Sequence, residues 1–140
     1  MMCNENTDHD DLSRLHVFYS HWPGGSAIRN FNHIAQQIDS KMTAEYDFGP
    51  EKNLQMYGSA VPPELDFDKL DDSGIPVALI LAKQDVAVQR ADTEFLRDKL
   101  PKSLVKWIEI EGGHLTIGLG KDVSWIYEDI LPLIKKYNTN

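Results

Sequence analysis

An acid and a histidine in this sequence lie 29 residues apart (114 minus 85), each shortly after an apolar run. Asp85 follows the run 75–82, and His114 follows the run 104–110 after two glycines that let the backbone turn sharply. A buried carboxylate that holds one ring nitrogen of a histidine leaves the other nitrogen able to take a proton from a serine. The two residues therefore fit the acid and the base of a hydrolytic Ser–Asp–His triad.

Each of the two residues also has a plainer interpretation. An Asp between a strand and a helix is often only a cap or a turn former, and a Gly-Gly-His is often only a loop. Four further histidines compete as candidates, namely His9, His16, His21 and His33. None of them has the spacing to cysteines or carboxylates that is typical of metal ligands, so we expect no metal and no cofactor.

Alternating strands and helices are expected to position the pair. Residues 75–82 form a continuous apolar run that predicts a strand buried on both faces, and 104–110 give a partly alternating strand pattern. Apolar spacing predicts helices over 91–100 and 121–137, the second kinked or divided at Pro132. This order predicts a parallel sheet, in which reactive groups gather at the carboxyl ends of the strands. The acid and the histidine occupy those positions, in the chain order of α/β-hydrolase triads.

The first 74 residues carry less regular patterns. Residues 1–13 are acidic and polar, which predicts disorder, and 14–21 hold a short apolar cluster that is either strand or irregular. Residues 27–42 have one apolar helical face, which predicts an amphipathic helix. Residues 44–75 contain many turn formers and no long periodic segment. The apolar face of the predicted helix consists of Ile28, Phe31, Ile34, Ala35 and Ile38.

Composition excludes several classes of protein. Lys and Arg total 14 against 22 Asp and Glu, a formal charge of -8, which argues against a nucleic-acid partner. Cys3 is the single cysteine, so no internal disulfide can form. The sequence has no signal-peptide pattern and no apolar run of about 20 residues, so we expect no transmembrane segment.

Several short motifs, in order, resemble the acid lipases of the gastric and lysosomal type. Residues 21–36 (HWPGGSAIRNFNHIAQ) are similar to the family's H-x-P-[AG]-G-[TS] motif and to the helix that follows it. The resemblance covers residues 14–137 and includes the separation between the acid and the histidine. Further matches are Tyr46-Asp47-Phe48-Gly49, Asn53, Tyr57-Gly58, Pro62-Pro63, Ile75-Pro76-Val77, Asp85, Leu100-Pro101 and His114.

The resemblance implies an α/β fold that is part of an α/β-hydrolase: the late lid segment plus the last two parallel strands and their helices. Residues 1–13 are then a disordered N-terminus, 14–74 a lid-like helical and loop segment, and 75–140 the C-terminal βαβα part of the core. In that family the lid is inserted between the sixth and seventh strands of an eight-stranded sheet. The two predicted strands therefore correspond to the seventh and eighth.

The sequence departs from the family pattern beside both site residues. The segment Leu81-Ala82-Lys83-Gln84-Asp85 lacks the glycines that members commonly have before the acid. The segment Gly113-His114-Leu115-Thr116 replaces the usual Asn-His-Leu-Asp. These departures change the expected geometry of the two loops, although the two candidate residues stay the same.

A nucleophile is missing from these 140 residues, because no G-x-S-x-G occurs among them. Ser59 is the nearest imitation but lacks the strand-to-helix elbow, and Ser20 and Ser26 are better interpreted as turn or cap residues. The family's oxyanion hole uses the N–H after the nucleophile and one from an earlier loop, so it is absent as well. We expect the chain alone not to hydrolyse esters efficiently.

The resemblance implies the C-terminal fragment of a serine ester hydrolase, a lipase acting on neutral lipids such as triglycerides or sterol esters. Such a fragment contributes Asp85 and His114 but no nucleophile, and its partner is a lipid ester. The alternative is a non-catalytic, lipase-like structural or binding subunit whose open strand edge docks a protein. A third possibility is a small α/β domain of unrelated function. Family members are lysosomal or secreted, and the sequence leaves the acyl chain, the alcohol and the compartment open.

Overall fold

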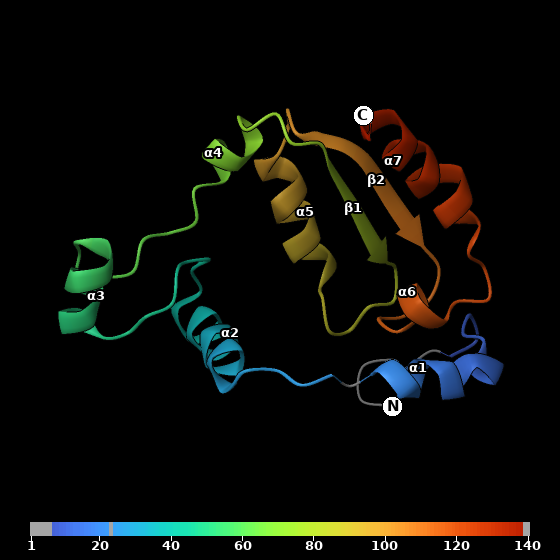
Figure 1. Ribbon diagram of the computed structural model, residues 1–140, viewed down its shortest axis with the longest axis horizontal. Helices are drawn as coiled ribbons and strands as arrows, with labels where there is room; N and C mark the ends of the chain where they lie inside the picture. Colours follow the sequence, from blue (N-terminus) through green and yellow to red (C-terminus); the bar gives the residue numbers. More distant parts are fainter. Residues whose placement is uncertain (1–6, 23, 139–140) are drawn as a thin grey trace. The chain divides into compact units, whose positions relative to one another are not determined.

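A computed structural model of the chain describes residues 7–22 and 24–138, shown in Figure 1. These residues form two compact units. The first unit contains residues 7–22 and 67–138, and the second contains residues 24–66. The second unit is therefore an insertion in the sequence of the first.

A two-stranded parallel sheet lies at the centre of the first unit (Figure 1). Strand β1 (Val77–Ala82) pairs with β2 (Leu104–Ile110), and helix α5 (Arg90–Lys99) connects them. Their apolar runs explain the two strands, and the helix ends just before Pro101, which cannot continue it. The predicted order of strand, helix, strand and helix is confirmed, and the architecture is that of a partial α/β fold.

The apolar core of this unit forms between the sheet and the C-terminal helices. Its buried centre consists of Ala82, Ile108 and Ile110. Three partly buried side chains pack against this centre: Ile80 of β1, and Trp125 and Ile130 of the C-terminal helical segment. The core lies near the carboxyl ends of both strands, so it supports the backbone from which the two site loops begin.

Strand β1 is buried only at its carboxyl end. Leu81 and Ala82 are buried, whereas the first four residues are partly exposed. Within the part of the chain that the structure describes, β1 pairs with β2 alone. The prediction of a strand buried on both faces is therefore wrong for the first four residues. Burial of a strand depends on its neighbours, which an apolar run does not specify.

The helix predicted over 121–137 is continuous from residue 124 and changes from π-helical to α-helical just before Pro132. Helix α6 (Thr116–Leu119) is short, a π-helical turn η2 (Ile126–Ile130) follows, and helix α7 (Leu131–Tyr137) completes the segment. Pro132 lies in the first turn of α7, which follows the π turn directly. The π turn places the N–H of Leu131 on the carbonyl of Ile126, which widens the helix just before the proline.

Residues 7–13 have defined structure, which differs from the prediction of disorder over 1–13. Residues 1–6 lie outside the described residues. Asp10 forms an antiparallel bridge with Gly120, and Asp11 donates its backbone N–H to the carbonyl of Leu119 at 2.6 Å. The side chain of Asp11 accepts the N–H of Ser13 and so caps the short helix η1 (Leu12–Arg14). These polar residues are ordered because they pair with a segment more than a hundred residues away, which composition does not reveal.

Residues 15–21 form a helix, α1 (Leu15–His21), so the expectation of strand or irregular structure is wrong. Phe18, Tyr19 and Trp22 lie at helical spacing and their rings contact one another, with the Phe18 and Trp22 centroids 5.3 Å apart. Phe18 also lies against Gly118 of α6. A helical spacing in so short a segment is hard to separate from a strand pattern.

The second unit consists of two helices joined by an ordered turn region. The predicted amphipathic helix is confirmed as α2 (Ile28–Ser40). Helix α3 (Pro50–Tyr57) was not predicted, because its eight residues are too few to show a helical period. It begins at Pro50 after Gly49, at φ 88°, and ends at Gly58, at φ 72°, so glycine conformational freedom sets both ends.

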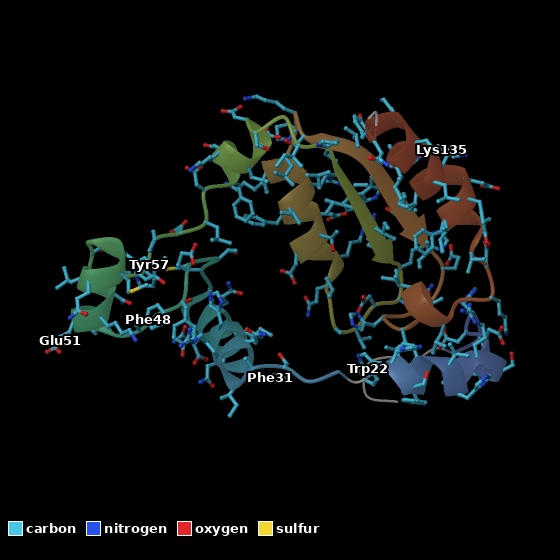
Figure 2. The ribbon with its side chains drawn as sticks, viewed as in Figure 1. Trp22, Phe31, Phe48, Glu51, Tyr57 and Lys135 are labelled. Atoms are coloured by element: carbon cyan, nitrogen blue, oxygen red, sulfur yellow. The ribbon has the colours of Figure 1, made fainter. Side chains whose placement is uncertain are left out.

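A buried polar side chain lies in the interior of the second unit. The buried side chain of Asn53 accepts the N–H of Phe48 at 2.9 Å and donates to the side chain of Asp47 and the carbonyl of Ala60, at 2.7 and 3.0 Å. The rings of Phe48 and Tyr57 lie beside each other with centroids 6.1 Å apart (Figure 2). The hydrogen bonds of Asn53 therefore join helix α3 to the segments on both sides of it.

The remaining helix, α4 (Phe67–Asp71), belongs to the first unit. The buried carboxylate of Asp71 accepts the backbone N–H groups of Lys102 and Ser103 at 2.9 and 2.7 Å. These bonds tie α4 to the start of β2. Among the described residues, no helix is both long and apolar enough to cross a bilayer.

Candidate active site

Two loops meet at the carboxyl edge of the sheet: the acid loop (residues 83–88), after β1, and the histidine loop (residues 111–115), after β2. The neighbouring parallel strands end at the same edge, which brings the two loops together. Backbone hydrogen bonds continue from the sheet into them: Lys83 donates to the carbonyl of Ile110 at 3.0 Å, and Gln84 to that of Gly112 at 2.9 Å. The loops are therefore fixed to each other by their main chains.

Asp85 and His114 face each other across these loops. Oδ2 of Asp85 lies 2.9 Å from Nδ1 of His114, a hydrogen-bond distance. The Asp85 side chain is only 6% exposed, whereas that of His114 is 38% exposed. An ionised carboxylate only accepts, so Nδ1 carries a proton, and in the neutral form of the imidazole Nε2 is the nitrogen with a lone pair. The structure brings the two predicted site residues into the relationship that a triad needs.

The second oxygen of Asp85 is held by the backbone of its own loop. Oδ1 accepts the N–H groups of Ala87 and Val88 at 2.8 and 2.9 Å. Burial by itself raises the pKa of Asp85, but hydrogen bonds from Val88, His114 and Ala87 favour the charged form and lower the pKa below its ordinary value of 3.8. The carboxylate is therefore ionised at neutral pH and fixed in position.

Gln84 is a site residue that the sequence analysis did not identify. Its side-chain Oε1 accepts the N–H of Gly112 at 2.6 Å, which links the acid loop to the histidine loop. Lys83 and Glu111 add an ion pair between the same two loops. Gln84 lies in the segment before Asp85 that lacks the glycines commonly present there in the acid lipases that the sequence resembles. That departure was the available signal, and the structure gives it a side-chain role.

Thr116 is the second residue that was missed. Its hydroxyl accepts the N–H of Gly113 at 2.9 Å and donates to Oδ1 of Asp10 at 2.6 Å. Thr116 and Asp10 are 4% and 1% exposed, so both bonds are buried. Thr116 also lies at a departure from the family pattern. Both departures therefore place a side chain that holds one of the two backbone amides just before His114.

The three serines considered as alternatives have local hydrogen bonds. The hydroxyl of Ser59 accepts the N–H of Val61 at 3.2 Å, and that of Ser20 donates to the carbonyl of Val17 at 2.6 Å. Ser26 accepts the side-chain amide of Asn30 at 3.1 Å, while Ala27 is the N-cap of α2. These are the contacts of turn and helix-end residues.

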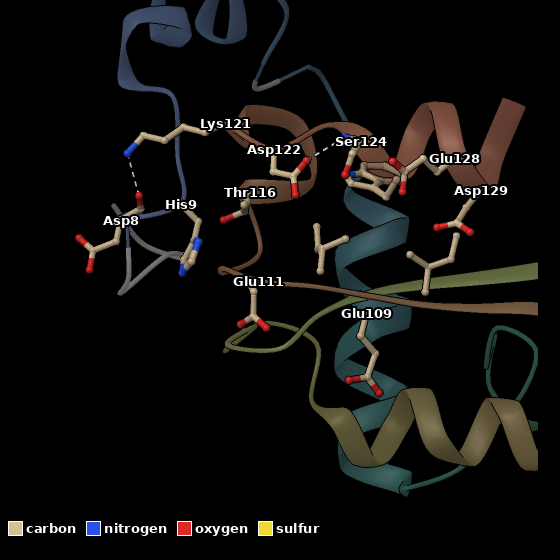
Figure 3. Close-up of a pocket in the computed structure, with 13 residues that line it drawn as sticks. Asp8, His9, Glu109, Glu111, Thr116, Lys121, Asp122, Ser124, Glu128 and Asp129 are labelled. Atoms are coloured by element: carbon tan, nitrogen blue, oxygen red, sulfur yellow. Dashed lines mark hydrogen bonds between the residues drawn. The ribbon is translucent and has the colours of Figure 1, made fainter.

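The described residues contain no group of three or more His, Cys, Asp or Glu side chains arranged to hold a metal ion. A separate pocket of about 350 Å³ lies beside the histidine loop (Figure 3). Acidic residues dominate its lining, with His9 and Lys121 as its basic groups, and Asp85 and His114 are not part of it. Its acidic residues are Asp8, Glu109, Glu111, Asp122, Glu128 and Asp129.

The parallel βα units define the class: a partial α/β fold with a hydrogen-bonded acid and histidine at the carboxyl edge of its sheet. No family model matches the chain. Individual relatives do match it. Mouse lipase member K is 30% identical over 129 residues, and rat lysosomal acid lipase/cholesteryl ester hydrolase is 27% identical over 139 residues. Human gastric triacylglycerol lipase is 28% identical over 139 residues.

These alignments cover 90%, 98% and 97% of this chain, respectively. They cover 31%, 34% and 34% of the three relatives, so the chain spans about one third of the length of the proteins that it matches. The chain is a homologue of the acid lipases, as the motifs in its sequence indicated.

Proposed function

We propose that this chain is the C-terminal part of a serine ester hydrolase with the α/β-hydrolase fold, in which Asp85 and His114 are the acid and the base of the triad. The observation that carries the proposal is the 2.9 Å hydrogen bond between Oδ2 of Asp85 and Nδ1 of His114. It occurs in a homologue of lipases, at the strand ends where this class of fold places its catalytic groups. Residues outside these 140 supply the serine, since no G-x-S-x-G is present.

The chemistry assigns one role to each nitrogen of His114. Nε2 takes the proton of the serine hydroxyl while the serine oxygen bonds to the ester carbonyl carbon, and it then returns this proton to the alcohol as the carbon–oxygen ester bond breaks. Water repeats the sequence on the acyl-serine, which releases the acid and restores the serine. Nδ1 stays bonded to Asp85, whose negative charge stabilises the imidazolium. The lowered pKa of Asp85 keeps that charge in place.

The proposed substrate is a neutral lipid ester. Two of the relatives are named a triacylglycerol lipase and a cholesteryl ester hydrolase. In the second unit, helix α2 exposes a row of large apolar side chains, including Phe31, which Figure 2 labels. Such a face suits a lid-like segment that covers an acyl chain, because an apolar helix face otherwise remains in contact with water. The members of this row are Ile28, Phe31, Ile34 and Ile38.

The test replaces the matching segment of human gastric triacylglycerol lipase with this chain and measures hydrolysis of a triglyceride emulsion. We expect activity in the hybrid, and a loss of about 10³- to 10⁴-fold in kcat for Asp85→Asn and for His114→Gln. Labelling of the serine by a fluorophosphonate probe should decline in the same variants. Asp92→Asn and His16→Gln, which change exposed residues of the same types, are the matched controls.

Two outcomes contradict the proposal. A hybrid that hydrolyses the lipid equally well with Asp85→Asn contains a different acid. A hybrid that folds but neither hydrolyses the lipid nor reacts with the probe favours the non-catalytic, lipase-like structural or binding subunit.

A further inference from the structure

We infer that Asp10 is a positioning residue for His114 and that it acts through the hydroxyl of Thr116. The inference rests on the proposed function, in which His114 is the base. Asp10 lies 106 residues before Thr116, and the two side chains meet in a buried hydrogen bond. Two hydrogen bonds connect Asp10 to the residue before His114: one joins Asp10 to the Thr116 hydroxyl, and the other joins that hydroxyl to the backbone N–H of Gly113.

The direction of the two hydrogen bonds makes the hydroxyl a two-way link. The N–H of Gly113 can only donate, so the oxygen of the Thr116 hydroxyl accepts it. The single proton of that hydroxyl is then directed to Oδ1 of Asp10. Because the Asp10 carboxylate accepts the hydroxyl proton, it fixes the orientation of the hydroxyl, which leaves a lone pair of the oxygen directed at the N–H of Gly113. Removal of the Thr116 hydroxyl takes this partner from the amide next to His114, and removal of the Asp10 side chain takes away the acceptor that directs the hydroxyl proton.

The two glycines before His114 explain why such a link is needed. Gly112 has φ 113°, and a Gly-Gly sequence allows many backbone directions. The local sequence alone therefore does not fix the direction of the backbone at His114, or the position of its ring. Side chains hold both amides instead, Gln84 on Gly112 and Thr116 on Gly113. Thr116 also donates its own N–H to the carbonyl of Gly113 at 3.0 Å, which closes the turn around His114.

The backbone on both sides of Asp10 places its carboxylate. Asp11 donates its N–H to the carbonyl of Leu119, and Lys121 donates its N–H to the carbonyl of His9 at 2.9 Å. The side chain of Lys121 reaches the carbonyl of Asp8 at 2.7 Å, as Figure 3 shows. Residues 8–11 are therefore hydrogen-bonded along residues 119–121, at the end of α6. The backbone pairing of Asp10 with Gly120 therefore holds the Asp10 carboxylate beside Thr116.

The experiment measures the ring proton on Nδ1 of His114 in the isotopically labelled full chain by NMR. Its exchange with water reports how well the ring is held against Asp85. We expect Thr116→Val, which removes the hydroxyl at nearly equal volume, to speed this exchange about tenfold, as the loss of one net hydrogen bond of about 1.4 kcal/mol implies. Asp10→Ala should have the same effect.

Conservative variants provide the matched controls. Thr116→Ser keeps the hydroxyl and Asp10→Asn keeps an acceptor oxygen, so both should retain the exchange rate of the parent chain. The amide signals of β1 and β2, together with the urea midpoint, report the fold in each variant. A structural role alone lowers the midpoint and leaves the ring proton unchanged, which would overturn the inference.

Asp85→Asn separates this inference from the proposed function. If the ring proton is unaffected by Thr116→Val and by Asp10→Ala but its signal is lost with Asp85→Asn, the link is refuted and the Asp85–His114 pair stands. If Asp85→Asn leaves the signal as it was, the pair itself fails, and with it the proposed function. If Thr116→Val unfolds the chain, the Asp10→Ala and Asp10→Asn variants decide the matter.

Discussion

Gly112 packs directly on the side chain of Thr116. A Cβ atom at Gly112 would lie 2.4 Å from Oγ1 of Thr116 and 2.6 Å from its Cγ2. The φ of Gly112, 113°, is also one that other residues rarely adopt. Two independent reasons therefore require glycine at this position, and both concern the turn that precedes His114.

Gly112→Ala should destabilise the chain by about 1–3 kcal/mol, the range for a strained backbone conformation, with the clash against Thr116 placing it at the upper end. Urea unfolding followed by circular dichroism measures the loss. Gly74→Ala is the matched control for the backbone term, since Gly74 has φ 73° and open space around it. Gly24→Ala, with neither feature, should change little. Equal losses at positions 112 and 74 would show that the contact with Thr116 adds nothing.

Asn53→Ala should lower the free energy of unfolding of the second unit by about 1–3 kcal/mol, because the half-buried N–H of Phe48 and the carbonyl of Ala60 lose the buried Asn53 side chain as their partner. Amide hydrogen exchange at Phe48 measures the effect directly. Asn32→Ala, at an exposed position of α2, is the control and should leave that exchange unchanged. Slow exchange at Phe48 in the Asn53 variant would contradict the role of this side chain.

The stability of the first unit should depend on pH through Asp85. The folded state lowers the pKa of this carboxyl, so its contribution is fully present above the unfolded value of about 4. The contribution is lost as the pH falls through the lower pKa of the folded state. Urea unfolding between pH 2 and pH 7 should therefore give a gap between the parent chain and Asp85→Asn that narrows in acid. A gap that stays constant over this range contradicts the prediction.

The chain alone should not hydrolyse a short-chain chromogenic ester above the background rate, because a G-x-S-x-G is not among its residues. Ser59→Ala should make no difference, since the Ser59 hydroxyl accepts the N–H of Val61 as a turn residue does. A measured activity that disappears with Ser59→Ala would reverse the assignment of the nucleophile.

The arrangement of β1, α5 and β2 could be predicted from sequence because each element carries its own short-range pattern. The rule that parallel strands share a carboxyl edge then placed Asp85 and His114 near each other. The two residues lie 29 apart in sequence, and one βα unit accounts for that separation. Local pattern and chain order were sufficient for this part of the site.

The rest of the site could not be predicted, because it depends on contacts between distant segments. Nothing near Asp10 in the sequence indicates that its carboxylate meets Thr116, and the polarity of its neighbours favours disorder. The sequence around Gln84 likewise gives no sign of its role, because its side chain accepts the N–H of Gly112, which belongs to the other loop. Helix α1 was missed for a different reason, since seven residues carry too little periodicity to distinguish a helix from a strand.

The chain leaves the first unit after Trp22 and returns to it at Phe67. Each of the two units has its own set of internal contacts, and residues 24–66 form one continuous block of the sequence. Residues 24–66 can accordingly change in sequence, and even in length, while the loops that carry Asp85 and His114 stay as they are. Mutations can therefore alter the inserted unit without a matching change in the loops of Asp85 and His114, and the same division marks where segments are best exchanged in the laboratory.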